Sequence, residues 1–168
     1  CVENNQSELV KFLIPVIEDH FGIVQNKVYD QDCIKSYLFS SRELAHYFKN
    51  DLKVKEQVPD CILKATDEIK AAYIRGFFDA DGTASLGGNK DRWEITVRLS
   101  NVNKILVEQT SMMVSSLGIT HSVTSCQRTN RKRLNGELMA RDHLLRVSYK
   151  GLIKFNKLVG FKIDSKRR

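Results

Sequence analysis

Two aspartates stand close together immediately before a glycine, in the string Asp79-Ala80-Asp81-Gly82. Neighbouring carboxylates attract a hard divalent cation such as Mg²⁺, which prefers oxygen ligands and keeps several of its waters. An Asp-x-Asp-Gly turn can also simply end a helix. A calcium-binding EF-hand loop that began at Asp79 would need an acid at its twelfth position, where the sequence has Lys90. The string therefore predicts a divalent-metal site or a helix-ending turn, and it excludes an EF-hand.

The residues before these acids predict a helix with one face of small side chains. Ala72, Gly76 and Ala80 recur every four residues, so they lie along one face of a helix. Such a face lets a second helix approach with its backbone close, although small residues at this spacing also occur in ordinary cores. We expect a helix over Ile69–Phe78, with both acids at its C-terminal end and Gly82 freeing the backbone to turn.

Residues 74–82, with the sequence IRGFFDADG, resemble the nine-residue signature that names the LAGLIDADG family of homing endonucleases. They differ from it at four of the nine positions, and three of these differences are apolar exchanges. Arg75 replaces an alanine, and we expect it on a face turned away from the paired helix. Val58-Pro59 and the lysines before them resemble the connector ahead of the second motif in two-motif members, notably those carried within inteins.

The resemblance implies an α+β fold of two pseudo-symmetric αββαββα units with antiparallel sheets, in which the two motif helices pack together. Residues 1–58 would be the remainder of a first, N-terminally truncated half, and residues 59–168 the second half with the Asp-Ala-Asp-Gly motif. By analogy with the repeat, a first motif would need about two dozen residues upstream of Cys1. We expect that missing segment, or a second chain, to complete the helix interface.

The resemblance also assigns chemistry to individual residues. Asp81 would bind Mg²⁺ or Mn²⁺ and position the attacking water, the backbone carbonyl of Ala80 would be a weaker metal contact, and Asp79 a less essential acid. The implied reaction is in-line attack on a phosphodiester, which breaks both strands of a specific DNA site. A lysine usually assists as a point charge. Lys55 and Lys166 are the candidates, and each could equally be a solvated surface residue.

The elements that must position these residues recur with a shift of 96 residues. Helices are predicted over Ser7–Phe21 and Asn103–Leu117, and a glycine ends each, Gly22 and Gly118 respectively. Strand pairs and further helices follow in both halves: Ile23–Ser41 and Ser41–Phe48 in the first, Leu144–Ser148 and Lys150–Val159 in the second. Matching apolar positions arise by chance, so the repeat supports two units only together with the motif.

A predicted strand over Trp93–Ser100 alternates apolar and polar residues, so its polar face is available to a DNA groove. In the major groove Arg reads guanine, and Gln or Asn reads adenine. A solvated sheet face would look the same, and an error of one residue in register would exchange the faces. The predicted DNA contacts are Lys90, Arg92, Glu94, Thr96, Arg98, Ser122, Thr124, Gln127, Arg128, Arg131, Lys132, Arg133 and Arg146, with Gln25, Lys27, Tyr29 and Lys35 in similar places in the first unit.

The composition agrees with a nucleic-acid partner without requiring one. A formal charge of +7 over 168 residues favours polyanions, but it also fits a basic surface with no specific partner. No apolar stretch approaches the roughly 20 residues that cross a membrane, and there is no secretory signal. The four cysteines have no CxxC spacing, which argues against a zinc ribbon or a disulfide framework and indicates free thiols in a reducing, intracellular compartment (cytoplasm, nucleoid or organelle).

Three functions remain open from the sequence. The first is a site-specific, metal-dependent homing endonuclease of duplex DNA, and the intact Asp-Ala-Asp-Gly motif favours it. The second is a member of the family that acts as an RNA maturase or a DNA-binding regulator. The third is a homodimer of single-motif chains; such chains usually begin close to the motif, whereas Tyr73 lies deep in this one.

Overall fold

The computed structural model describes residues 2–3, 7–31, 34–89, 92–126 and 141–162, which form two compact units, residues 1–51 and 52–168. The sequence predicted a boundary after Val58. The units instead divide between Asp51 and Leu52, because Val58 is fully buried in the core of the second unit and its N–H donates to Oε1 of Gln109 at 2.7 Å. Residues 52–59, called the connector below, therefore belong to the second unit.

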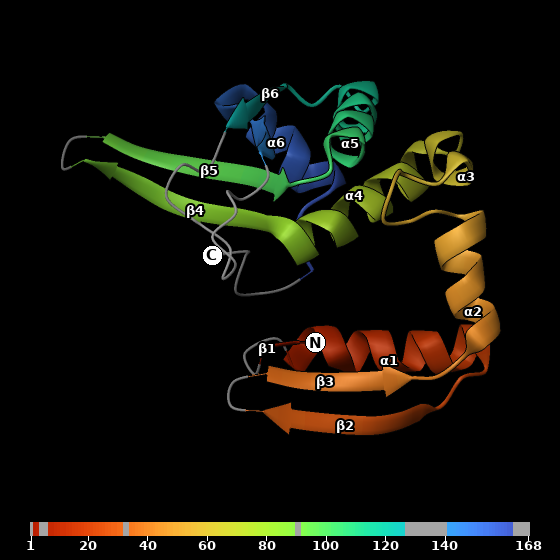
Figure 1. The fold of residues 1–168 in the computed structure, drawn as a ribbon. Coiled ribbons are helices and arrows are strands. Elements are labelled where there is room, and N and C mark those ends of the chain that lie inside the picture. The colour runs from red at the N-terminus through yellow and green to blue at the C-terminus, as the bar shows by residue number, and fades with distance from the viewer. Residues whose placement is uncertain (1, 4–6, 32–33, 90–91, 127–140, 163–168) are drawn as a thin grey trace. The chain divides into compact units, whose positions relative to one another are not determined.

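The second unit has the predicted αββαββα order around a four-stranded antiparallel sheet, with strand order β4-β5-β7-β6 (Figure 1). Alternate residues such as Val97 and Leu145 are buried while Arg98 and Arg146 are exposed, so the helices cover one face. The elements are α3 (Asp60–Leu63), α4 (Asp67–Asp81), β4 (Gly82–Asn89), β5 (Arg92–Asn101), α5 (Lys104–Ser116), β6 (His121–Cys126), β7 (Asp142–Val147) and α6 (Tyr149–Leu158).

An aromatic cluster joins the motif helix to α6 at the centre of this core. The rings of Phe78 and Phe155 have centroids 4.9 Å apart, and Phe161 completes the cluster at 6.3 and 5.8 Å from them. Each fully buried aromatic ring contributes about 1.5–3 kcal/mol by leaving water. The backbone of α6 also approaches the sheet closely, because a Cβ on Gly151 would lie 2.3 Å from the carbonyl oxygen of Thr120. The direction of α4 is thus fixed from the side opposite its small residues.

The first unit repeats part of the second. Its elements are β1 (Val2–Glu3), α1 (Ser7–Phe21), β2 (Gln25–Gln31), β3 (Ile34–Phe39), α2 (Arg42–His46) and the π-helix η2 (Tyr47–Asp51). The sheet order β1-β3-β2 corresponds to β5-β7-β6 in the second unit. Gly22 and Gly118, which end α1 and α5, both have left-handed φ angles, +64° and +67°. The predicted repeat is therefore confirmed.

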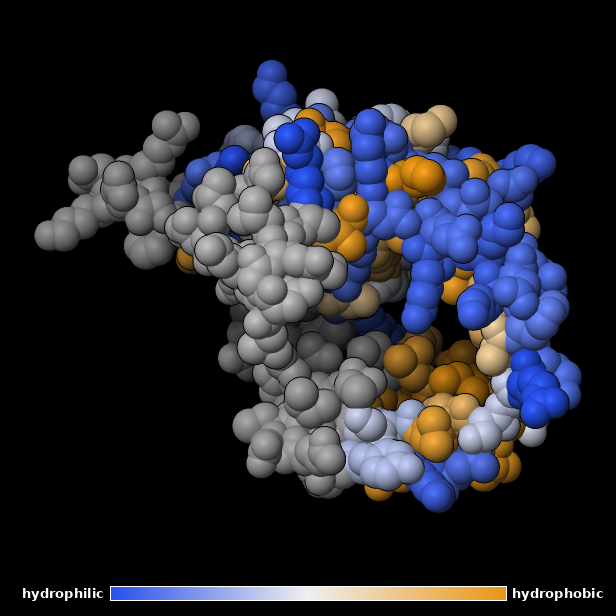
Figure 2. Space-filling model, in the orientation of Figure 1, coloured by the Kyte–Doolittle hydropathy of each residue, from blue (hydrophilic) through white to orange (hydrophobic). Residues whose placement is uncertain are grey.

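Local sequence pattern did not predict three features of the structure. Apolar spacing in the helices predicted over Ser7–Phe21 and Ser41–Phe48 suggests that Phe12 and Tyr47 face inward, but each is 47% exposed, and hydrophobic residues reach the surface of this unit (Figure 2). The family resemblance implied a strand at β4, but the local pattern did not indicate it, because glycines and small residues disfavour strands; β4 forms by pairing with β5 along its whole length. Gly82 has an ordinary φ of −85°, and it is needed for space, because a Cβ there would lie 2.4 Å from the Phe78 carbonyl oxygen.

Candidate active site and nucleic-acid interface

Asp81 is the last residue of α4, and its side chain is exposed. The chain turns at Gly82 directly into β4, and the pairing of Gly82 with Leu99 brings the end of β5 back to the helix terminus. There the Nδ2 amide of Asn101 donates to Oδ2 of Asp81 at 2.7 Å. Asn101 was not among the predicted site residues, since its approach to Asp81 depends on the β4–β5 register, which no local pattern encodes.

Asp79 faces the interior, unlike Asp81. It is 5% exposed, and both of its carboxylate oxygens accept from the backbone N–H of Lys162 at 3.1 Å. The prediction of two neighbouring carboxylates in one metal site assumed that α4 had already ended. Because the helix runs through Asp81, residues two apart point about 200° away from each other. Asp81 is thus the exposed acid of the motif, and Asp79 anchors the segment that follows α6.

The small-residue face of α4 is exposed, as the sequence indicated. Ala72, Gly76 and Ala80 are all exposed, and a Cβ added to Gly76 would meet no atom within 4 Å. On the opposite side of the helix, Ile74 and Phe78 are fully buried. The small-residue face therefore lies on the surface, and no described atom crowds its central residue, Gly76.

Arg75, the departure from the family signature, points away from this face as expected. Its Nε donates to the backbone carbonyl of Val159, just beyond the C-terminal end of α6. A guanidinium group at this end of a helix also complements the helix dipole. Arg75 therefore strengthens the attachment of α4 to α6 and leaves the small-residue face clear.

Two residues of α4, Glu68 in its first turn and Tyr73 on its flank, have shifted pKa values. Glu68 has a pKa below its usual range, first because it accepts a backbone hydrogen bond and next because of a hydrogen bond with the Thr66 side chain. Tyr73 has a raised pKa because burial disfavours the phenolate. Tyr73 thus stays neutral at physiological pH and packs its ring 6.5 Å from that of Phe77.

The sheet register brings the described part of the predicted DNA-contacting set to one face. Arg98 pairs with Arg146, and Arg146 pairs with Ser122, so these three side chains form one row across β5, β7 and β6. Glu94 and Thr96 lie on the same face of β5, and Thr124 lies on the same face of β6. Glu94 forms an ion pair with Arg146 within this face, and their side chains are 60% and 44% exposed. The predicted alternation is confirmed for these residues.

The structure also shows the strand pairing of several other predicted contacts. Arg92 lies in β5 opposite Asn89. In the first unit, Tyr29 pairs with Ser36 and Lys35 pairs with Asp30. Because the register shifts between Gln25 and Lys27, these two residues do not lie on one face of the sheet. The predicted site residues that lie outside the described part of the chain are Lys90, Gln127, Arg128, Arg131, Lys132, Arg133 and Lys166.

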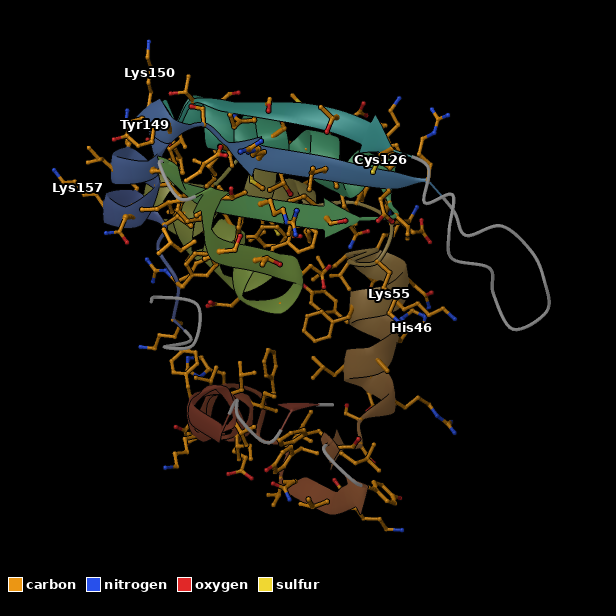
Figure 3. All side chains as sticks on the ribbon, turned by 90° about the vertical axis from the view of Figure 1, so that its left-hand side faces the viewer. His46, Lys55, Cys126, Tyr149, Lys150 and Lys157 are labelled. Carbon is orange, nitrogen blue, oxygen red and sulfur yellow. The ribbon has the colours of Figure 1, made fainter. Side chains whose placement is uncertain are left out.

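Positive charge is not confined to the sheet face. Lys150 and Lys157 project from the outer surface of α6, next to Tyr149, which is 83% exposed (Figure 3). Cys61 and Cys126 are free and exposed, as expected for thiols outside a disulfide framework, while Cys1 and Cys33 lie outside the described residues. Within the described ranges, no helix combines the length and apolar character needed to span a bilayer.

An α+β unit whose motif helix ends in an exposed acid beside a polar sheet face is the arrangement that the LAGLIDADG resemblance implied. The sequence model of the LAGLIDADG-like domain family matches residues 68–160, more than half of the chain. The chain therefore belongs to the LAGLIDADG family.

Several known proteins are similar to this chain. Two are described as DNA polymerases: one from Thermococcus sp. strain GE8, 27% identical over 151 residues, and one from Thermococcus hydrothermalis, 29% identical over 150. The matches cover 90% and 86% of this chain but 8% of each polymerase.

Solved structures of the homing endonuclease I-DmoI are also similar. The match to its complex with DNA and Mn has a TM-score of 0.63 at 21% sequence identity. It covers 95% of this chain and 78% of the I-DmoI chain. Its complex with DNA and Ca has a TM-score of 0.65 at 20% identity and covers 99% and 76%. At this level of identity the likeness establishes the fold.

Proposed function

We propose that this chain is the DNA-cutting part of a site-specific homing endonuclease that hydrolyses both strands of duplex DNA with a divalent metal ion. The observation that carries the proposal is the position of Asp81. Asp81 is exposed at the C-terminal end of the motif helix, next to the sheet face that carries Arg98 and Arg146. Family membership and the fold shared with I-DmoI in complex with DNA and Mn support it.

The donor set at Asp81 fits Mg²⁺ or Mn²⁺. These ions are usually bound through one or two carboxylates, with waters and substrate phosphates as the other ligands. Across the described residues, no three His, Cys, Asp or Glu side chains form a complete metal cage. Asp81 would supply the carboxylate and Ala80 a backbone carbonyl, while the phosphodiester supplies further oxygens. When bound, the ion would make water a stronger nucleophile and stabilise the leaving oxygen.

The protein's own groups orient the reaction. Asn101 engages one carboxylate oxygen of Asp81, which fixes the plane of the carboxylate at the helix end. Lys162 is a third candidate for the assisting lysine, in addition to Lys55 and Lys166. Its backbone N–H donates to Asp79, which belongs to the same motif as Asp81. An exposed ammonium group there would neutralise negative charge that develops on the phosphate.

The exposed face of Ala72, Gly76 and Ala80 would bind the motif helix of a second unit. Small side chains allow two helices to pack with their backbones close together. We propose that this second helix comes from another part of the same protein or from a second copy of the chain. The 168 residues without it should therefore cut poorly.

The two polymerase matches support an origin within a larger host protein. The similar segment is 8% of each polymerase, which fits an inserted element such as an intein. We propose that this chain is likewise part of an inserted element and acts inside the cell, where its thiols stay reduced. An RNA maturase or a DNA-binding regulator remains the second candidate, because a polar sheet face can bind nucleic acid without cutting it.

Metal dependence separates these functions. The full natural protein, incubated with a library of duplex targets, should cut a small set of related sequences in Mg²⁺ or Mn²⁺ and none in excess chelator. Sequencing the cut ends gives the site and shows whether both strands break. Specific DNA binding without cutting in either metal would identify a regulator, and cutting that persists in chelator would refute the metal-dependent mechanism.

The Glu94–Arg146 ion pair leads to a prediction about selectivity. Glu94→Gln removes a negative charge from the proposed DNA face and releases Arg146, so affinity for unrelated DNA should rise by up to about fivefold. Affinity for the cognate site should rise less, because Arg146 loses the partner that orients it. Binding is measured without metal over a range of salt concentrations.

Glu108→Gln is the matched control, since it removes the same charge and a comparable exposed ion pair, with Lys104 at 3.4 Å, from helix α5. Equal effects of the two substitutions would mean that net charge alone matters and that Glu94 has no role at the interface.

A further inference from the structure

The connector is attached to the second unit by one asparagine side chain. The Nδ2 amide of Asn103 donates to the carbonyl oxygens of Lys55 and Glu56, at 2.9 and 2.8 Å. Its Oδ1 accepts from the backbone N–H groups of Ile105 and Leu106 and so caps helix α5, at 3.0 and 3.3 Å. One side chain therefore joins the start of a helix to the connector.

The same hydrogen-bond path continues to the proposed catalytic acid. The backbone N–H of Asn103 donates to Oδ1 of Asn101 at 2.8 Å, and Nδ2 of Asn101 donates to Asp81 at 2.7 Å. A second attachment holds the connector further along, where the Val58 N–H donates to Gln109. The connector backbone is thus fixed at two points, and one of them leads directly to the end of the motif helix.

A helix cap alone does not require asparagine at position 103. Capping needs an acceptor oxygen, which serine or aspartate supplies as well. The two amide hydrogens of Asn103 have a separate use, because they bind two successive connector carbonyls that would otherwise be left to water. The choice of an amide is explained by the connector and not by the helix.

We infer that Asn103 is a positioning residue that ties the backbone of Lys55 to the hydrogen-bond path ending at Asp81, so that Lys55, rather than Lys162 or Lys166, is the lysine that assists phosphodiester hydrolysis there. The inference rests on the proposed function. A lysine on an unattached segment would lose conformational entropy each time it reached the phosphate. A hydrogen-bonded backbone at Lys55 and Glu56 removes much of that cost before DNA binds.

A double-mutant cycle in the full natural protein tests this inference. Asn103→Ser keeps the cap of α5 but removes both donors to the connector, and Lys55→Ala removes the ammonium group. Each should lower the single-turnover cutting rate on the identified target, by roughly tenfold to a hundredfold. The double variant should be about as slow as Lys55→Ala alone, because the two residues serve one function. DNA affinity without metal should change little.

The attachment of the connector by Asn103 can also be tested without DNA cleavage. Trypsin should cleave after Lys55 several-fold faster in Asn103→Ser than in the wild type, while the thermal unfolding midpoint stays close to that of the wild type because the cap is retained. Unchanged trypsin cleavage would show that Asn103 does not hold the connector.

Multiplicative losses in the double variant, or wild-type cutting by Lys55→Ala, would overturn the role of Lys55. A wild-type protein that cuts no target in any metal would refute the proposed function instead. The trypsin result would then decide separately whether Asn103 holds the connector.

Discussion

Asp81→Asn should lower metal-dependent cutting by about a thousandfold or more while leaving DNA affinity nearly unchanged. The substitution removes the negative charge that attracts the cation and keeps the shape of the side chain. Asp81 is exposed, and an asparagine oxygen can still accept from Asn101, so folding should be unaffected. Single-turnover cutting in Mg²⁺ and Mn²⁺, binding of the same target in chelator and thermal unfolding measure the three effects.

Asp60→Asn is the charge-matched control, because Asp60 is an exposed acid in the short helix α3 and not in the motif. It should cut like the wild type. Equal cutting by Asp81→Asn and the wild type would remove Asp81 from the mechanism. A comparable loss of DNA affinity would show that the carboxylate acts in binding rather than in metal chemistry.

The two aspartates of the motif have different roles in the structure, and the motif alone could not assign them. The sequence places the two aspartates two residues apart, and that spacing gives opposite directions only if the helix continues. Whether α4 ends at Phe78 or at Asp81 depends on its packing against α6 and on the tight approach of Gly82 to Phe78. Those contacts are tertiary, so local pattern analysis could not distinguish a buried anchor from an exposed ligand.

Local periodicity did predict much of the fold. Helix α1 begins and ends at Ser7 and Phe21 as expected, because its apolar spacing and the following Gly22 are local signals. The polar face of β5 was likewise predictable, since alternation needs only the strand itself. By contrast, β4 depends on pairing with β5, and the faces of Gln25 and Lys27 depend on the register of β2 and β3. Asn101 and Asn103 needed the assembled unit before their hydrogen bonds could be seen.

Gly76→Leu should leave this chain as stable as the wild type or slightly more stable, and yet abolish cutting. A Cβ at Gly76 meets nothing within 4 Å, and leucine favours a helix over glycine by somewhat less than about 1 kcal/mol. If a second motif helix packs on this face, however, the added side chain would push the two backbones apart and displace the acids at their ends. The loss in single-turnover cutting should be about a hundredfold or more. Thermal unfolding is measured on the 168-residue chain, and cutting is measured on the full natural protein.

Gly76→Ala is the matched control, since alanine is the residue already present at Ala72 and Ala80 on the same face. It should raise stability by about 0.8–1 kcal/mol and keep most of the cutting. The contrast between the two variants isolates side-chain size at a position that touches nothing within its own unit. If Gly76→Leu cut as well as Gly76→Ala, no helix would approach this face during the reaction, and Asp81 would have to work without a paired motif helix.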